Sequence, residues 1–410
     1  MNEKKHKQNL VIVLLVLVCS NVAVYGLPYM RSAFYNIMIE AMGLTNLEIS
    51  RLWSIFGIVA MMSYILGGYI ADVIPPKKLL IYTLIVSGIL HLYFSTIPSY
   101  TEMIIIFGLM GITTVLVFYP ASTKILACLG KGENQGKIFG SYYSLVGLLG
   151  IIITGIGFLL LNKGYGSQLV FCKIVRIYAL LNFLSALGVG VLFKESQFTS
   201  VVIDKIKYKE IPSVIKNSAV WIVAGIMLSN YVIYSFLTYI TPYLINIHNV
   251  STQNALLVNI VRDNVITILA GPIFGAMVDK VGSAVKVIRI GLTISLICLT
   301  IILIFPAQKI YFIIILLNIM IFSMMVIGIK GVGIVLISEV KFPVYLLGTV
   351  IGIVSFIGYS PDAFFYPLSG IILDTLGNRG YSVLIIICVL FSILGINLCS
   401  YLKKINSYSK

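Results

Sequence analysis

The sequence predicts an all-α membrane protein of twelve transmembrane helices, arranged as two pseudo-symmetric six-helix bundles. Hydrophobic residues make up 59% of the 410 residues and charged residues only 10%, a balance that soluble globular domains do not show. Apolar runs of about 20 residues, the length that crosses roughly 30 Å of hydrocarbon as a helix, recur between short polar breaks. Small-residue patterns of the first half also return in the second half.

The apolar runs define twelve expected spans. They cover residues 10–38, 47–71, 79–97, 102–128, 137–161, 171–193, 218–245, 251–278, 285–306, 310–339, 346–374 and 381–402. The longest polar segment, 194–217, lies between the sixth and the seventh span and is expected to be a cytoplasmic linker. It would join an N-terminal bundle, 1–193, to a C-terminal bundle, 218–410. No small-residue cleavage site follows the first apolar run, so we expect an uncleaved first helix.

The net charge of +15 is explained by membrane topology better than by nucleic-acid binding. Twelve spans place both termini on one side. With the termini inside, most of the 29 lysines and arginines fall in inner segments, as the positive-inside rule requires. We therefore expect cytoplasmic termini and no nucleic-acid partner. The six cysteines lie in or beside apolar spans without a C-x-x-C pair, which predicts neither a disulfide framework nor a metal site, and no cofactor is expected.

The two halves of the chain repeat each other. The segment G-G-Y-I-A-D ending at Asp72 returns as F-G-A-M-V-D ending at Asp279, each time after the second span of a half and before lysines. Small residues of the fifth span return in the eleventh at nearly the same offset: Gly140, Ser144, Gly147 and Gly150 against Gly348, Gly352, Ser355 and Gly358. Two independent patterns with one offset indicate a six-span unit used twice.

These repeated motifs resemble those of the major facilitator superfamily, and the resemblance covers essentially the whole chain. In that family a G-x-x-x-D pattern followed by basic residues joins the second helix to the third, and Gly68 to Asp72 match it here. Gly275 to Asp279 form the second copy, while Pro75 and Pro76 replace the family's glycine and arginine in the first. The resemblance implies transport by alternating access. It also implies a gating role for Gly68, Asp72, Gly275 and Asp279, with a solvated loop charge as the alternative for the two aspartates.

Three segments are similar to the organophosphate and sugar-phosphate permeases of that superfamily: 27–34, 119–140 and 357–364. The similarity implies that Arg31 binds an anion such as phosphate, where position alone leaves an arginine that reaches the membrane interface as an alternative. It also implies a bacterial branch near these permeases, located as a multi-pass protein in the cytoplasmic (inner) membrane. The seventh span lacks the second arginine of those permeases.

Arg262 is the most unusual residue of the sequence, because a charge near mid-membrane costs a few kcal/mol unless it has a partner, a cavity or a function. At about 1.5 Å per residue it lies roughly 16 Å into the eighth span. Asn259 precedes it by one turn on the same face. Its guanidinium is expected to grip an anionic substrate with two hydrogen bonds, and the alternative is a structural ion pair with Asp263 or Asp362.

Two carboxylates accompany the embedded cations. Asp263 follows Arg262 directly, but adjacent helix residues point about 100° apart, so the two are not expected to share one face fully. It is either the counter-charge of Arg262 or a proton-coupling group. Asp362 follows Pro361, whose missing N–H loosens the eleventh helix, and is either a titrating group of a gating helix or the partner of a cation.

Two lysines lie in equivalent helices of the two halves. Lys330, in the tenth span, is flanked by Gly328, Gly331 and Gly333, and we expect it in the transport cavity. Lys124, in the fourth span, is nearer the expected cytoplasmic end, where headgroup contact and a gating role are the alternatives.

The embedded cations outnumber the embedded carboxylates, which favours an anionic substrate. We therefore predict a secondary active transporter, monomeric in the lipid bilayer. It would move a sugar phosphate, a sugar acid or another organic acid, coupled to protons or in exchange for another anion. The expected substrate ligands are Arg31, Arg262, Lys330, Asn259 and Tyr35. The alternative is a membrane sensor that binds such a ligand without moving it; an enzyme is disfavoured because no H-E-x-x-H, nucleophile elbow or P-loop pattern is present.

Overall fold

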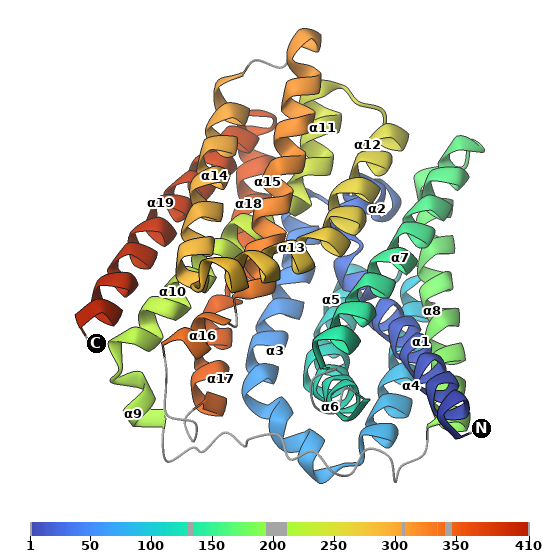
Figure 1. Ribbon diagram of the computed structural model, residues 1–410. Helices are drawn as coiled ribbons and strands as arrows, with labels where there is room; N and C mark the ends of the chain where they lie inside the picture. The colour runs from blue at the N-terminus through green and yellow to red at the C-terminus, as the bar shows by residue number, and fades with distance from the viewer. Residues whose placement is uncertain are drawn as a thin grey trace. The chain divides into compact units, whose positions relative to one another are not determined.

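The computed structural model describes residues 2–129, 135–193, 211–305, 308–333, 335–340 and 347–408, and every regular element in these ranges is a helix (Figure 1). Ten helices of the described ranges are long and apolar enough to cross a membrane. They overlap the first, the third to tenth and the twelfth expected spans, although the first expected span, 10–38, is divided between Val11–Tyr29 and a second helix that begins at Arg31. The second expected span is helix α3 (Asn46–Val73), and the eleventh is divided between α17 (Leu347–Gly358) and α18 (Pro361–Leu376). The predicted all-helical membrane class is therefore confirmed.

The chain divides into two compact units. Unit 1 comprises Met1–Gly43 and Ile58–Ile203, and unit 2 comprises Leu44–Gly57 and Asp204–Lys410. Besides part of α3, unit 1 contains α1 (Asn2–Tyr29), α2 (Arg31–Met42), α4 (Pro76–Phe94), α5 (Tyr100–Gly111), the π-helical segment η1 (Ile112–Phe118), α6 (Tyr119–Leu129), α7 (Gln135–Asn162) and α8 (Ser167–Leu192).

Close helix crossings hold unit 1 together, chiefly those of α8 with α4 and with α1. Glycines allow them: a Cβ added to Gly26 would lie 2.4 Å from the Tyr178 ring, and one added to Gly88 would lie 2.8 Å from Phe183. The Asn182 side chain donates to the Ala23 carbonyl at 3.1 Å and so links α8 to α1. Small residues that let side chains or backbones approach, joined by amide hydrogen bonds, are the usual means of packing helices in lipid.

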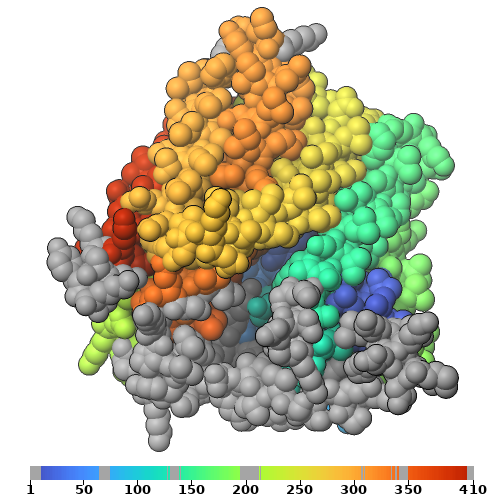
Figure 2. All heavy atoms as spheres, viewed as in Figure 1, coloured from blue at the N-terminus to red at the C-terminus, as the bar shows by residue number. Residues whose placement is uncertain are grey.

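Unit 2 contains the remaining helices. They are α9 (Ile211–Ile215), α10 (Ser218–Phe236), the 3₁₀ turn η5 (Leu237–Tyr239), α11 (Ile240–His248), α12 (Thr252–Asn259), the π-helical segment η6 (Ile260–Val265), α13 (Ile266–Val281), α14 (Ala284–Ile304), the 3₁₀ turn η7 (Lys309–Tyr311), α15 (Phe312–Val332), α16 (Val335–Glu339), α17, α18 and α19 (Arg379–Tyr408). Helix α10 packs on α19 and α17, and α14 packs between α15 and α19. In Figure 2 the yellow and amber residues of α12 and α13 form a continuous diagonal band over the face in view.

The crossing of α13 and α15 depends on Gly328. A Cβ added there would lie 2.2 Å from the Phe274 ring, so the ring of α13 occupies the space that a side chain would need. Of the glycines that flank Lys330, Gly328 thus receives an aromatic ring of the neighbouring helix.

The first turns of α3 pack along α18 within unit 2. Gly57 lies on the backbone of Asp362, where an added Cβ would come within 2.6 Å, and the Trp53 ring meets the Tyr366 ring edge-on with centroids 5.6 Å apart. Ser54 Oγ donates to the Ala363 carbonyl at 2.5 Å. The sequence boundaries 1–193 and 218–410 did not anticipate this grouping of Leu44–Gly57. Those boundaries stay predictions, and residues 194–210 of the expected linker lie outside the described residues.

Asp374, near the end of α18, caps the N-terminus of α3. Its Oδ1 accepts from the Asn46 backbone at 3.1 Å and from the Asn46 amide at 2.7 Å, and its Oδ2 accepts from the Leu47 N–H at 2.8 Å. The first N–H groups of a helix have no partner inside the helix, and a carboxylate there also meets the positive end of the helix dipole. One side chain therefore fixes where α3 begins on α18.

We expect Asp374→Ala to destabilise the protein by about 1 kcal/mol, because the N–H groups of Asn46 and Leu47 lose their acceptor. Thermal unfolding of the purified protein measures this, with a fall in melting temperature of about 2–4 °C. The matched control is Thr375→Ala, since the Thr375 hydroxyl bonds only carbonyls of its own helix. Equal melting temperatures for the two variants would contradict the capping role.

Candidate functional site

Arg262 lies in the π-helical segment η6 and is fully buried, with 0% of its surface exposed. Its Nε lies 3.0 Å from Asp263 Oδ1, and its Nη2 donates to Asp263 Oδ2 at 3.1 Å. Its Nη1 donates to the Leu237 carbonyl at 2.5 Å, in the 3₁₀ turn that interrupts the seventh span. The guanidinium is thus held by both carboxylate oxygens of Asp263 and by the Leu237 carbonyl oxygen, which lies between α10 and α11.

The carboxylate of Asp263 receives a further donor. The buried Asn259 amide donates to Asp263 Oδ2 at 2.9 Å, one turn away on the same face. Thr267 Oγ1 donates to the Asp263 backbone carbonyl. Of the two structural partners considered for Arg262, Asp263 is paired with it in the structure. The expectation that adjacent residues diverge assumed ideal α geometry, whereas η6 is π-helical and the two side chains lie within 3.0–3.1 Å of each other.

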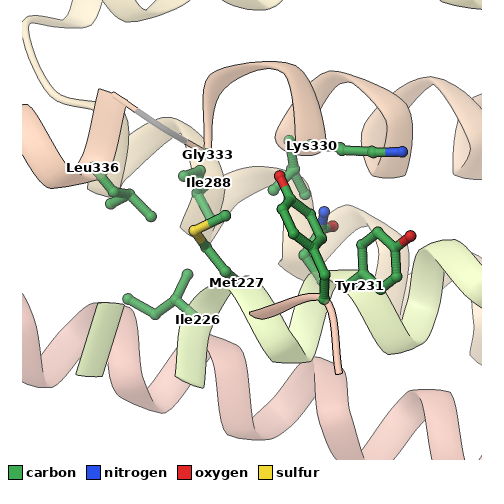
Figure 3. Close-up of a pocket in the computed structure, with 10 residues that line it drawn as sticks. Ile226, Met227, Tyr231, Ile288, Lys330, Gly333 and Leu336 are labelled. Atoms are coloured by element: carbon green, nitrogen blue, oxygen red, sulfur yellow. The ribbon is translucent and has the colours of Figure 1, made fainter. Parts of the chain in front are cut away.

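Lys330 makes a different kind of contact. Its ammonium lies 3.7 Å from the centroid of the Tyr234 ring and 5.5 Å from that of Tyr231, so it rests on two aromatic faces of α10. No carboxylate of the described residues pairs with it. In Figure 3 its chain extends past the Tyr231 ring, away from Met227 and Leu336.

Lys330 also lines a pocket of unit 2 (Figure 3). The space between atoms there is about 290 Å³, a volume that includes open solvent. The lining residues are Ile226, Met227, Asn230, Tyr231, Ile288, Ile329, Lys330, Gly333, Leu336 and Tyr359. The pocket therefore combines an apolar wall with one ammonium, one amide and two tyrosines.

Tyr231 connects this pocket to Asp362. The Tyr231 hydroxyl donates to Asp362 Oδ2 at 2.9 Å, and the carboxyl-bearing side chain is only 5% exposed. Asp362 lies in the first turn of α18, directly after the break at Tyr359 and Ser360. Pro361 begins α18, so the helix is interrupted where the missing proline N–H predicted it. One tyrosine thus contacts the lysine with its ring and the aspartate with its hydroxyl.

The remaining predicted ligands lie in unit 1. Arg31 is the first residue of α2, is buried, and has its guanidinium carbon 5.0 Å from the centroid of the Tyr29 ring. Tyr35, one turn later, is buried as well, and so is Lys124 on α6.

The predicted gating residues are only partly described. Gly275 and Asp279 lie on α13, and Asp279 is exposed. Gly68 and Asp72 fall within α3, but their side chains lie outside the described residues. The carboxylate that caps the neighbouring helix α14 belongs to Glu339 of α16, which accepts from Ser283 Oγ at 2.6 Å and from the Val285 N–H at 3.1 Å. Sequence reasoning did not identify Glu339.

Sequence reasoning also missed the aromatic residues around Lys330. The signal was present in S-N-Y-V-I-Y, residues 229–234, where Tyr231 and Tyr234 are three apart and therefore neighbours on one helix face. Because the seventh span carries no charge, it offered no reason to place a cation beside it. Asn230, in the same segment, was likewise not selected.

A chain of membrane-length helices with buried charges at helix interruptions has the features of a polytopic transport protein. The family model of the Major Facilitator Superfamily matches residues 11–363, and the chain belongs to that superfamily. It is a membrane transporter of this kind. The resemblance seen in the sequence is confirmed.

Relatives and solved structures agree with this assignment. The chain is 28% identical over 381 residues to "Inner membrane protein YihN" of Escherichia coli (strain K12), which covers 90% of each protein. The crystal structure of a mutant of the nucleoside transporter NupG superposes with a TM-score of 0.77 at 11% identity, covering 96% of this chain and 99% of that one. A bacterial homolog of the human lysosomal transporter Spinster, inward-facing and unoccupied, gives 0.73 at 13% identity, covering 97% of each. At such identities the structural likeness shows the fold, which in this superfamily has twelve helices.

We expect Arg262→Met and Asp263→Leu each to lower the melting temperature, because each leaves the opposite charge without its partner. The loss should fall at or below the lower end of the roughly 3–5 kcal/mol for a broken buried pair, since the Asp263 side chain is 24% exposed. The double variant removes both charges and should recover most of the loss. Thermal unfolding of purified protein measures the cycle, with Lys280→Met, at an exposed site on α13, as control. Strictly additive losses would show that the two side chains do not stabilise each other.

Proposed function

We propose that this transporter moves a small organic anion, such as a sugar phosphate, a sugar acid or another organic acid, by alternating access. The observation that carries the proposal is the state of Lys330. A lysine on tyrosine rings is stabilised less completely than one in an ion pair and keeps its attraction for a negatively charged ligand. It also lines the pocket of unit 2, and this supports it as the cation that an entering anion would meet.

Arg262 has a different role in this proposal. Asp263 and Asn259 hold it in a neutral, hydrogen-bonded group, so an anion gains its guanidinium only by replacing the Asp263 carboxylate. When the anion replaces the Asp263 carboxylate, the number of charge-assisted hydrogen bonds to Arg262 stays the same. This supports Arg262 and Asn259 as ligands of the substrate in the substrate-bound protein. Arg31 and Tyr35 are proposed as the corresponding ligands of unit 1.

The cellular setting is part of the proposal. The E. coli relative is named an inner membrane protein, and this supports the same location for the present multi-pass chain. We propose that the protein acts as a monomer. The distribution of lysine and arginine supports cytoplasmic termini. The competing function is a sensor that binds the anion without moving it.

Uptake by proteoliposomes tests the substrate class and the ligands together. We expect the protein to accumulate gluconate or glycerol 3-phosphate. Lys330→Gln should reduce uptake at least tenfold, because the pocket loses its cation. Arg262→Lys should abolish uptake in a protein that still folds and inserts, because an ammonium does not reproduce the two-pronged guanidinium geometry.

Lys280→Gln is the control and should leave uptake unchanged, since Lys280 is exposed on α13. Normal uptake by both Lys330→Gln and Arg262→Lys would refute the proposed anion site. Saturable binding without accumulation would establish the sensor function instead.

Proton coupling is proposed for Asp362 or Asp263. Asp362 is the better placed of the two, because its carboxylate accepts from the Tyr231 hydroxyl and the ring of the same tyrosine contacts Lys330. We expect an inward proton gradient to accelerate uptake and Asp362→Asn to remove that acceleration. Asp263→Asn serves as the comparison for the second carboxylate. If the gradient leaves uptake by the unmodified protein unchanged, exchange against an internal anion is the mechanism and neither carboxylate couples protons.

A further inference from the structure

The amide of Asn230 is a polar group of the pocket that no described side chain or backbone group satisfies. Asn230 lies on α10, is 4% exposed and lines the same pocket as Lys330. Its Oδ1 is buried without a hydrogen-bond partner, and the amide makes no hydrogen bond to a described residue. A buried acceptor without a hydrogen bond lowers the stability of the folded protein, so the presence of an asparagine at this position calls for an explanation.

Other asparagines within the helices show the contrast. Asn182 donates to the Tyr178 and Ala23 carbonyls, Asn318 donates to the Cys298 carbonyl, and Asn259 donates to Asp263. Each of these amides joins one part of the fold to another through its NH₂ group, although the Asn182 Oδ1 is also buried without a partner. Asn230 is the one amide of these four that makes no hydrogen bond to a described residue through either end, which points to a partner that enters from the pocket.

The position of Asn230 relates it to the lysine. Tyr234 follows Asn230 by four residues and therefore lies next to it on one face of α10. The Tyr234 ring carries the Lys330 ammonium at 3.7 Å. The Asn230 amide and the Lys330 ammonium therefore belong to residues that line one pocket, with the ammonium over a ring about one helical turn from Asn230.

We propose that Asn230 is a specificity-determining residue that binds a hydroxyl group of the substrate beside the anionic group held by Lys330. The amide offers a donor and an acceptor, and a hydroxyl supplies both complements whichever way the amide is turned. The substrates are then hydroxylated anions, and anions with a plain hydrocarbon chain are rejected. A site built to bind a hydroxyl discriminates strongly, because the analogue without it leaves the amide unsatisfied. This inference rests on the proposed function of the Lys330 pocket.

Binding to the purified full-length chain, measured calorimetrically, tests the inference with two matched pairs of probes. Glycerol 3-phosphate is compared with propyl phosphate, and gluconate with hexanoate, so that each pair shares its charged group and chain length. The unmodified protein should bind the hydroxylated member at least about tenfold more tightly. Asn230→Leu should remove this preference by weakening the hydroxylated member alone, whereas Lys330→Gln should weaken both members.

Asn254→Leu, the same substitution at an exposed position of α12, is the control and should keep the preference. Should Asn230→Leu fail to fold, Asn230→Ala supplies the same comparison with a smaller side chain. An unmodified protein without preference, or an Asn230 variant that keeps it, overturns the inference and leaves the anion site standing. Equal weakening of both members by the Asn230 variant also overturns it and assigns the amide to a bound water. If the unmodified protein binds none of the four probes, the proposed function fails, and the inference with it.

Discussion

The ion pair between Arg262 and Asp263 meets the most severe constraint on this molecule, which is that a charge inside the membrane has to be compensated by the protein itself. The compensation comes from the next residue in the chain, with the Leu237 carbonyl and Asn259 completing the hydrogen bonds. Asp362 and Lys330 both contact a different residue, Tyr231.

The two cations of unit 2 thus differ in what they offer a ligand. Arg262 already has the Asp263 carboxylate and the Leu237 carbonyl as acceptors, so a ligand must compete with the carboxylate of the adjacent residue. Lys330 has aromatic rings as neighbours, and a ligand adds to those contacts without displacing an ion. The pocket is lined by the lysine, although the sequence draws attention first to the arginine. Asn230 gives that pocket a neutral polar group as well.

The sequence was sufficient for the features that depend on local or periodic patterns. Hydropathy predicted the helical membrane class, Pro361 predicted the break before α18, and the Gly68–Asp72 and Gly275–Asp279 motifs predicted the superfamily. Contacts between residues that are far apart in the chain could not be predicted from the sequence. Tyr231 and Asp362 are separated by 131 positions, and Asn46 and Asp374 by 328, and neither partner carries a mark of the other. The pairing of Arg262 with Asp263 was kept open as one alternative, but its geometry was not foreseen, because nothing in I-V-R-D-N-V signals a π turn.

The π turn of η6 has a further consequence for the eighth span. A π turn holds one residue more than an α turn, so it shifts the angular phase of everything beyond it by about 100°. Helix α12 and helix α13 are therefore two out-of-phase segments of one continuous rod, and Arg262 and Asp263 occupy the phase boundary. The faces that the two segments present to their neighbours are therefore set by where this one extra residue lies, which is at the residues whose charges the fold must keep together.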